Sequence, residues 1–272
     1  MCIILVRVRA VLCILFFLIF LAAVSAAAGS FIHKGAVFSP VSSANALKPK
    51  IIEISPKNNS KDVFMNEKII VEADQDIADA KITVSEANKK KKKIGGKVEV
   101  EGRRAEFTPL YLLEPNTLYE VKVSVKSKAE KWSGTAKSVF TTKDMGSEMW
   151  VAVNLGKVHT VRIYEGNFPV HMMLASGGRD ERENSTPRGV FRVQDRGQSF
   201  WSDRFNEGAY YWVRVKDQIL FHSVPKDVQW KTKEEEHRKL GLPASHGCIR
   251  LDEKDAKWFY ENIPEGTLVI IH

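Results

Sequence analysis

The sequence predicts a mainly β protein in which two successive β modules follow an apolar N-terminal helix, and only the second module carries short helices. Segments with alternating apolar and polar residues fill positions 51–143 and resume at 149, which is typical of half-buried strands. Turn-forming Gly, Pro and Asn residues separate these segments. The chain has 272 residues, of which 44% are hydrophobic, enough for two separate cores.

The N-terminal segment predicts export. Arg7 and Arg9 precede nineteen uncharged residues, 10–28, a length that crosses a bilayer. Positive charge ahead of the run keeps the N-terminus in the cytoplasm and sends the rest across the membrane. Because small residues end the run, we expect residues 1–28 to be either a cleavable signal peptide or an uncleaved membrane anchor. The protein is then extracytoplasmic, in the cell envelope, and either membrane-anchored or secreted.

Residues 29–49 lack periodicity and predict a linker, and residues 50–143 predict an antiparallel β-sandwich. Its strands are expected at 68–74, 81–86, 97–102, 104–109, 118–127 and 138–142. The stretches ISPKNNSKDVFMNEKIIVEAD and FTPLYLLEPNTLYEVKV, with the closing FTT, resemble bacterial immunoglobulin-like (Ig-like) domains. That resemblance implies a spacer or binding module without catalytic residues. The run Lys89–Lys93 predicts a solvated charged loop, with a binding patch for an anionic polymer as the alternative.

A short hinge, KDMGSE, leads to the second module at 148–272, where strands are expected at 149–155, 158–166, 168–176, 189–195, 210–223 and 267–272. An amphipathic helix should begin at Asp252 or its neighbour and end before Pro264. Its apolar stripe comprises Ala256, Phe259, Tyr260 and Ile263. A shorter helix is predicted within 231–241 and ends at Gly241.

Cys248 is the only cysteine beyond the N-terminal segment, which holds Cys2 and Cys13. An internal disulfide is therefore impossible in the exported part, and Cys248 is either a buried inert residue or a nucleophile. A thiol attacks carbonyl carbon as the thiolate and needs a nearby base. Two histidines are candidates: His246, two residues before the cysteine, and His222, at the end of the apolar strand QILFHS.

The neighbours of Cys248 supply further groups for acyl chemistry. Gly247 lets the backbone pass close to a ligand, so the amides of residues 247 and 248 are candidate donors to a developing oxyanion. The planar guanidinium group of Arg250 suits the binding of a substrate carboxylate. The alternative is that Arg250 forms a structural ion pair.

Five segments occur in the order of a known family. HMMLASGG, STPRGVFRV, ILFHS, SHGCIRL and DEKDAKWFYENIPEGTLVII resemble the L,D-transpeptidase (YkuD) catalytic domain, over residues 148–272. The resemblance implies a β-sandwich catalytic domain in which Cys248 is the nucleophile and His222 the base. It further implies that the carbonyl of Ser223 orients His222, and that His246 and Gly247 shape the pocket and its oxyanion hole.

The same resemblance implies that Ser245 supports the Cys248 loop on its substrate-binding side and that Arg250 orients the substrate. Twenty-two residues separate His222 from Ser245, more than in many members of the family, so we expect an enlarged lid on which Trp230 contacts substrate. The remaining conspicuous residues receive structural interpretations. Pro187 and Gly189 form a turn, Phe191 packs, Gly177 and Gly178 serve either a turn or the approach of substrate backbone, and Trp150, Trp201, Trp212 and Trp258 belong to the core.

The predicted function is therefore acyl transfer on peptidoglycan stem peptides, forming 3→3 cross-links through a Cys248 thioester. The resemblance implies inhibition by carbapenems. It also implies a reaction that requires neither a metal nor an organic cofactor. The net charge of +8 suits an anionic envelope, and we expect no nucleic-acid partner.

Two alternatives stay open. One is a related enzyme with another acceptor, either water, as in an L,D-carboxypeptidase, or a different amine. The other is a catalytically inert wall-binding adaptor. A papain-like peptidase is disfavoured because its cysteine precedes its histidine, whereas His222 precedes Cys248 here.

Overall fold

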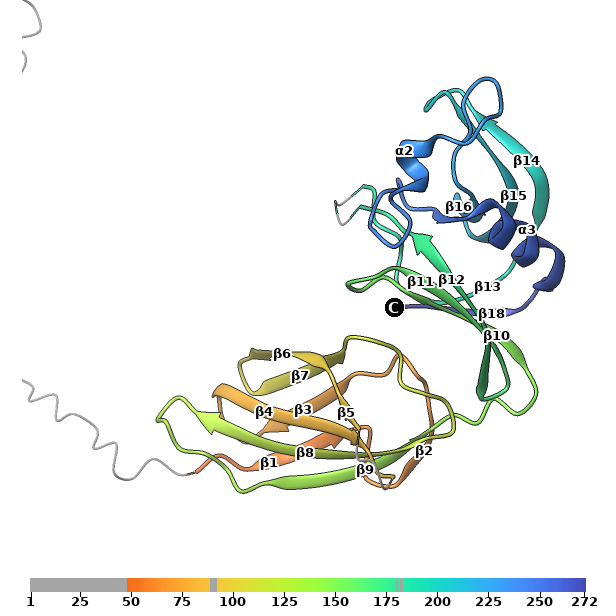
Figure 1. Ribbon diagram of the computed structural model, residues 1–272. Helices are drawn as coiled ribbons and strands as arrows, with labels where there is room; N and C mark the ends of the chain where they lie inside the picture. The colour runs from red at the N-terminus through yellow and green to blue at the C-terminus, as the bar shows by residue number, and fades with distance from the viewer. Residues whose placement is uncertain (1–47, 89–91, 180, 182) are drawn as a thin grey trace, which may run out of the picture. The chain divides into compact units, whose positions relative to one another are not determined.

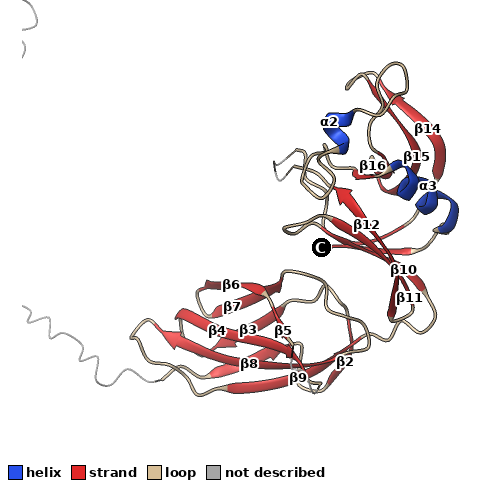
Figure 2. Ribbon diagram, viewed as in Figure 1, coloured by secondary structure: helices blue, strands red, loops and turns tan. Residues whose placement is uncertain are grey.

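The computed structural model describes residues 48–88, 92–179, 181 and 183–272 (Figure 1). The predicted signal or anchor at 1–28, nearly all of the linker and most of the Lys89–Lys93 run lie outside these residues. In the part that is described, no helix has the length and apolar character needed to span a membrane. Strands dominate both modules, in agreement with the predicted mainly β class (Figure 2).

The first module consists of two sheets, as expected for a sandwich. One sheet has the order β1-β3-β7-β6, and the other has the order β2-β9-β8-β4-β5. Along β8 every second residue is buried, because successive side chains of a strand point to opposite faces. The strands are β1 (Ile51–Ser55), β2 (Ser60–Val63), β3 (Ile69–Ala73), β4 (Ile77–Glu86), β5 (Lys93–Ile94), β6 (Gly96–Glu101), β7 (Arg104–Pro109), β8 (Leu118–Ser127) and β9 (Ala136–Thr142).

The core of the first module draws buried side chains from both sheets, among them Val71, Phe107, Tyr119 and Phe140. The rings of Tyr119 and Phe140 stack at 5.5 Å between centroids. The hydroxyl oxygen of Tyr119 accepts a hydrogen bond from the amide of Glu114 at 2.9 Å, so the one polar atom of this buried ring is satisfied.

The second module contains nine strands in the order β13-β18-β10-β11-β12-β17-β16-β15-β14. Two of them, β14 and β17, were not predicted. Only two residue pairs join β12 to β17, and one core collects buried side chains from both arms of the sheet and from α3. The strands are β10 (Met149–Asn154), β11 (Thr160–Glu165), β12 (Phe168–Ser176), β13 (Gly189–Arg192), β14 (Arg196–Ser202), β15 (Glu207–Lys216), β16 (Ile219–Ser223), β17 (Ile249–Leu251) and β18 (Leu268–Ile271).

The helix α3 (Glu253–Asn262) forms as the sequence predicts. Asp252 caps it by accepting a hydrogen bond from the amide of Lys254 at 3.0 Å. Phe259 is fully buried and stacks on Phe221 at 4.3 Å, which fixes α3 against β16. The second helix, α2 (Glu234–His237), is shorter than predicted and has no buried residue, because it lacks the apolar stripe that holds α3 in place.

The site is positioned by a parallel pairing between β16 and β17. Their register places Phe221 opposite Ile249 and His222 opposite Arg250. Cys248 directly precedes β17, so it lies beside the strand that carries His222. The parallel pairing therefore brings together two residues that are 26 positions apart in the sequence: His222 lies on β16, and Cys248 directly precedes β17.

Candidate active site

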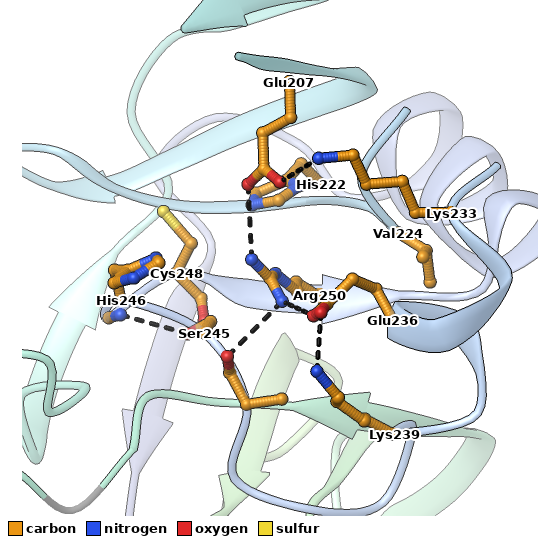
Figure 3. A network of polar contacts seen from close by, with 12 residues as sticks. Glu207, His222, Val224, Lys233, Glu236, Lys239, Ser245, His246, Cys248 and Arg250 are labelled. Carbon is orange, nitrogen blue, oxygen red and sulfur yellow. Dashed lines mark hydrogen bonds and ion pairs between the residues drawn. The ribbon is translucent and has the colours of Figure 1, made fainter. Parts of the chain in front are cut away.

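Cys248 and His222 line one pocket of about 520 Å³. Ser245, His246 and Arg250 line it as well, so five of the predicted site residues meet there. Figure 3 shows these side chains close together around the start of β17. Among the described residues, no group of three or more His, Cys, Asp or Glu side chains is placed to hold a metal ion.

His222 is held in one tautomer by the backbone. Its Nδ1 lies 2.6 Å from the carbonyl oxygen of Ser223, which can only accept, so Nδ1 carries the proton and donates it. The lone pair of the ring is then on Nε2. Burial of the ring and the charge of Arg250 outweigh the hydrogen bond to Ser223 and lower the pKa of His222 to about 3.

Cys248 is protonated in the resting site. Its Sγ donates to the carbonyl oxygen of Gln218 at 3.3 Å. Burial raises the pKa of the thiol, against smaller lowering effects from a backbone hydrogen bond at Leu220 and from the charge of Arg250. Since the pKa of His222 moves down while that of Cys248 moves up, the resting pair is a neutral thiol and a neutral imidazole.

The backbone around Cys248 is fixed by Ser245. Its hydroxyl donates to the carbonyl oxygen of Cys248 at 2.5 Å and accepts from the amide of Gly247 at 3.0 Å. Gly247 has φ +126°, a conformation that favours glycine. The prediction that the Gly247 amide serves as an oxyanion donor does not hold in this conformation, because that amide is already bonded to Ser245.

A second segment supports the same loop. The carbonyl oxygen of Gly177 accepts from the amides of Ala244 and Ser245, each at 2.9 Å. A Cβ on Gly178 would lie 2.0 Å from the carbonyl oxygen of Asn184, so only glycine fits there. Gly178 thus allows residues 184–186 to approach, while the carbonyl of Gly177 holds the loop that leads to Cys248, and neither is a function predicted for them.

Thr186 completes this support, and sequence reasoning missed it. Its hydroxyl donates to the carbonyl oxygen of Gly247 at 2.7 Å and accepts from the amide of Gly178 at 2.8 Å. The side chain is buried. The segment STPRG was predicted to form a turn through Pro187 and Gly189, and nothing in the local pattern indicated the distant partners of its threonine.

Arg250 is buried in a network of charges. Its Nη1 lies 2.5 Å from Glu236 of α2, and its Nη2 lies 3.4 Å from Glu207 of β15 (Figure 3). Lys239 contacts the same Glu236 at 2.6 Å, and Lys233 contacts Glu207 at 3.1 Å. Two carboxylates of the protein therefore occupy the guanidinium that was predicted to orient substrate, and the alternative, a structural ion pair, describes its contacts.

We expect Arg250→Met to lower the free energy of unfolding by about 3 kcal/mol, because it leaves two partly buried carboxylates without their shared cation. Thermal and urea unfolding of the full chain measure the change. Lys257→Met, which removes an exposed ion pair to Glu261 on α3, is the matched control and should change stability by less than about 1 kcal/mol. An equal loss in the two variants would contradict the structural role of Arg250.

The same network makes stability depend on pH. Burial opposes ionisation of Glu236, but Lys239 and Arg250 outweigh it, so its pKa lies below the ordinary value of 4.5. This contribution is fully present above pH 4.5 and is lost as the pH falls through the lower pKa of the folded state. The stability difference between wild type and Arg250→Met should therefore shrink in that acidic range.

The predicted lid at 223–244 contributes little to the pocket. Pro225 is the one residue of this stretch that lines it. Trp230, which was expected to contact substrate, instead stacks on Tyr210 at 4.9 Å and packs against Trp201 at 5.8 Å. Lys226 anchors the segment, since its buried ammonium donates to Thr232 and pairs with Glu253.

The aromatic wall of the pocket comes from the hairpin formed by β14 and β15. Phe200, Trp201, Phe205 and Trp212 line it. Trp201 and Trp212 were predicted to belong to the core, and their place in the pocket corrects that prediction. Trp150 is fully buried as predicted, while Trp258 is half-buried and stacks on His171 at 4.4 Å. The density of aromatic residues in SFW and YYW was the available signal for this wall.

Comparison with known proteins gives two family matches. The L,D-transpeptidase catalytic domain (YkuD) matches residues 148–271, and the bacterial Ig-like domain matches residues 45–142. A protein of Bacillus subtilis (strain 168), named "Putative L,D-transpeptidase YciB", is 45% identical over 150 residues, which cover 50% of this chain and 77% of the relative.

Two solved structures are similar at low identity. An L,D-transpeptidase from Mycobacterium smegmatis has 18% identity and a TM-score of 0.39, and the match covers 83% of this chain and 100% of that one. A structure titled as LD transpeptidase LdtMt1 in complex with imipenem has 20% identity and a TM-score of 0.38, with the match covering 83% of this chain and 100% of that one.

Proposed function

The chain belongs to the L,D-transpeptidase family, and from that premise we propose that it is a cysteine-dependent acyltransferase that forms 3→3 cross-links between peptidoglycan stem peptides. The observation that carries this proposal is the shared pocket of Cys248 and His222, in which the imidazole keeps a lone pair on Nε2. A thiol beside such a base can attack a carbonyl carbon.

The first half-reaction forms the thioester. Nε2 of His222 takes the thiol proton as Sγ of Cys248 attacks the carbonyl carbon at the L-centre of the third residue of a tetrapeptide stem. The C–N bond to the terminal D-alanine then breaks, and the departing amine takes the proton from His222. Because the resting pair is neutral, proton transfer accompanies attack, and no preformed thiolate is needed.

The second half-reaction transfers the acyl group. An amine of a neighbouring stem attacks the thioester, the C–S bond breaks, and the proton passes through His222 back to Sγ. The amide of Cys248 is the proposed donor to the oxyanion, since the Gly247 amide is bonded to Ser245. The aromatic side chains of the hairpin exclude water from the thioester, which favours an amine acceptor over hydrolysis.

The other parts of the chain fit the same proposal. The apolar N-terminal segment exports the catalytic domain to the cell envelope, and the Ig-like domain serves as a spacer. Stem peptides are the proposed substrates, and carbapenems, which acylate the cysteine, are the proposed inhibitors.

Product analysis tests the acyl acceptor. Incubated with a purified tetrapeptide stem, the full chain should release D-alanine and yield peptide dimers, detected by mass spectrometry. Tripeptide alone would assign L,D-carboxypeptidase activity instead. Absence of both products, together with binding to isolated sacculi, would favour the inert adaptor and contradict the proposal.

A further inference from the structure

The second histidine of the pocket has a partner that the mechanism above does not use. Nη2 of Arg179 lies 2.6 Å from Nε2 of His246. Arg179 follows β12 in the segment SGGR, far from His246 in the sequence, and the predicted site did not include it.

This contact decides the tautomer of His246. A guanidinium has no acceptor, so Nε2 must accept from Nη2, and the ring proton is then on Nδ1. Both histidines of the site therefore carry the proton on Nδ1, but their lone pairs differ. The Nε2 lone pair of His222 belongs to a ring that lines the same pocket as Cys248, whereas that of His246 is bonded to Arg179.

Arg179 is held in place by the backbone beside it. Its amide donates to the carbonyl oxygen of Ser245 at 3.1 Å, and Gly178 forms a parallel bridge with Ser245. The segment that carries Arg179 is thus joined to the loop that carries His246. The arginine reaches the imidazole from a backbone that is hydrogen-bonded to the same loop.

A neighbouring aromatic ring also orients His246. Phe205, between β14 and β15, stacks on the imidazole at 4.3 Å with an interplanar angle of 14°. The guanidinium of Arg204 lies 5.1 Å from the centre of the Phe205 ring. His246 is therefore oriented both by a hydrogen bond at Nε2 and by stacking on one face.

We propose that Arg179 is a positioning residue, which occupies the lone pair of His246 and leaves that ring only an Nδ1–H donor to offer to substrate. This inference rests on the proposed function and refines it. Of the two histidines, His222 alone accepts the thiol proton, and His246 acts as a neutral donor. The choice of base is thereby made by a residue outside the SHGCIRL segment.

Nitrogen-15 NMR of the imidazole rings in the full chain tests the tautomer directly. The wild type should show His246 with its proton on Nδ1, assigned by the loss of its signals in His246→Gln. In Arg179→Met the proton should shift towards Nε2, while Arg179→Lys, which keeps a donor, should retain the wild-type pattern. Arg192→Met, which removes an arginine that bonds to Gly266, is the control and should leave the pattern unchanged.

The pH profile is a second readout that a purely structural role would not change. Burial, then the charges of Arg179, Arg250 and Arg204, lower the pKa of His246 against the opposing charge of Glu207. Removing Arg179 frees the Nε2 lone pair and lets this pKa rise, so the titration of His246, followed through the same imidazole NMR signals, should move to higher pH in Arg179→Met.

A double-mutant cycle completes the test. If Arg179 acts through His246, Arg179→Met should cost little further activity in a His246→Gln background. The inference is overturned if wild-type His246 carries its proton on Nε2, or if Arg179→Met changes neither the tautomer nor the pH profile. The NMR result does not depend on activity, so an inert wild type would refute the proposed function without deciding the tautomer.

Discussion

Cys248→Ala should abolish acylation of the protein, lowering its rate by at least about a thousandfold, because the nucleophile is removed and no other side chain of the pocket replaces it. The measurement is the intact mass of the full chain after incubation with a carbapenem. The wild type should gain the mass of one inhibitor molecule, and the variant should gain none.

The chain offers a matched control for this experiment. Cys2 and Cys13 are the other cysteines of the sequence, and a Cys2→Ser, Cys13→Ser variant should still gain the adduct. Thermal unfolding of Cys248→Ala establishes that the variant is folded. An adduct on Cys248→Ala would place the acylated group elsewhere and remove the basis of the proposed mechanism.

His222→Gln should lower the acylation rate by about a hundredfold or more, the usual contribution of a general base. Glutamine keeps a polar side chain of similar length but has no basic nitrogen to accept the thiol proton. The rate of adduct formation, followed by mass spectrometry or by inhibitor absorbance, gives the ratio. His171→Gln is the control, since His171 stacks on Trp258 and does not line the pocket.

A comparison of the two histidines of the pocket tests which of them is the base. His246→Gln should reduce the rate by a smaller factor than His222→Gln, because the Nε2 lone pair of His246 is bonded to Arg179. The reverse order would identify His246 as the base and contradict both the mechanism and the role of Arg179.

The neutral state of Cys248 and His222 affects which reagents the thiol reacts with. A preformed thiolate reacts with any accessible electrophile, whereas a buried thiol with a raised pKa reacts when an electrophile is bound next to its base. The pocket thus favours acylating agents that bind within it over simple alkylating reagents. The low pKa of His222 keeps the base unprotonated through mildly acidic conditions.

How well an element could be predicted from the sequence depends on how far apart along the chain its interacting residues lie. Alternation around Val71 and Tyr119 predicted six of the nine strands of the first module, and the apolar stripe and acidic cap predicted α3, because these signals lie within a few neighbouring residues. The strands β1, β2, β5, β14 and β17 were missed. In β17 three residues in succession are buried, so there is no alternation to detect.

For the site, the order of residues along the chain was enough to show which chemical groups are present and, through the family resemblance, to single out Cys248 and His222. Which of these groups are already bonded within the protein became known from the fold alone. There the Gly247 amide is bonded to Ser245, Arg250 is paired with Glu207 and Glu236, and His246 is bonded to Arg179. Apart from Ser245 and Gly247, these partners lie far apart in the sequence, so each contact depends on which distant segments pack together, and strand order and register set that packing.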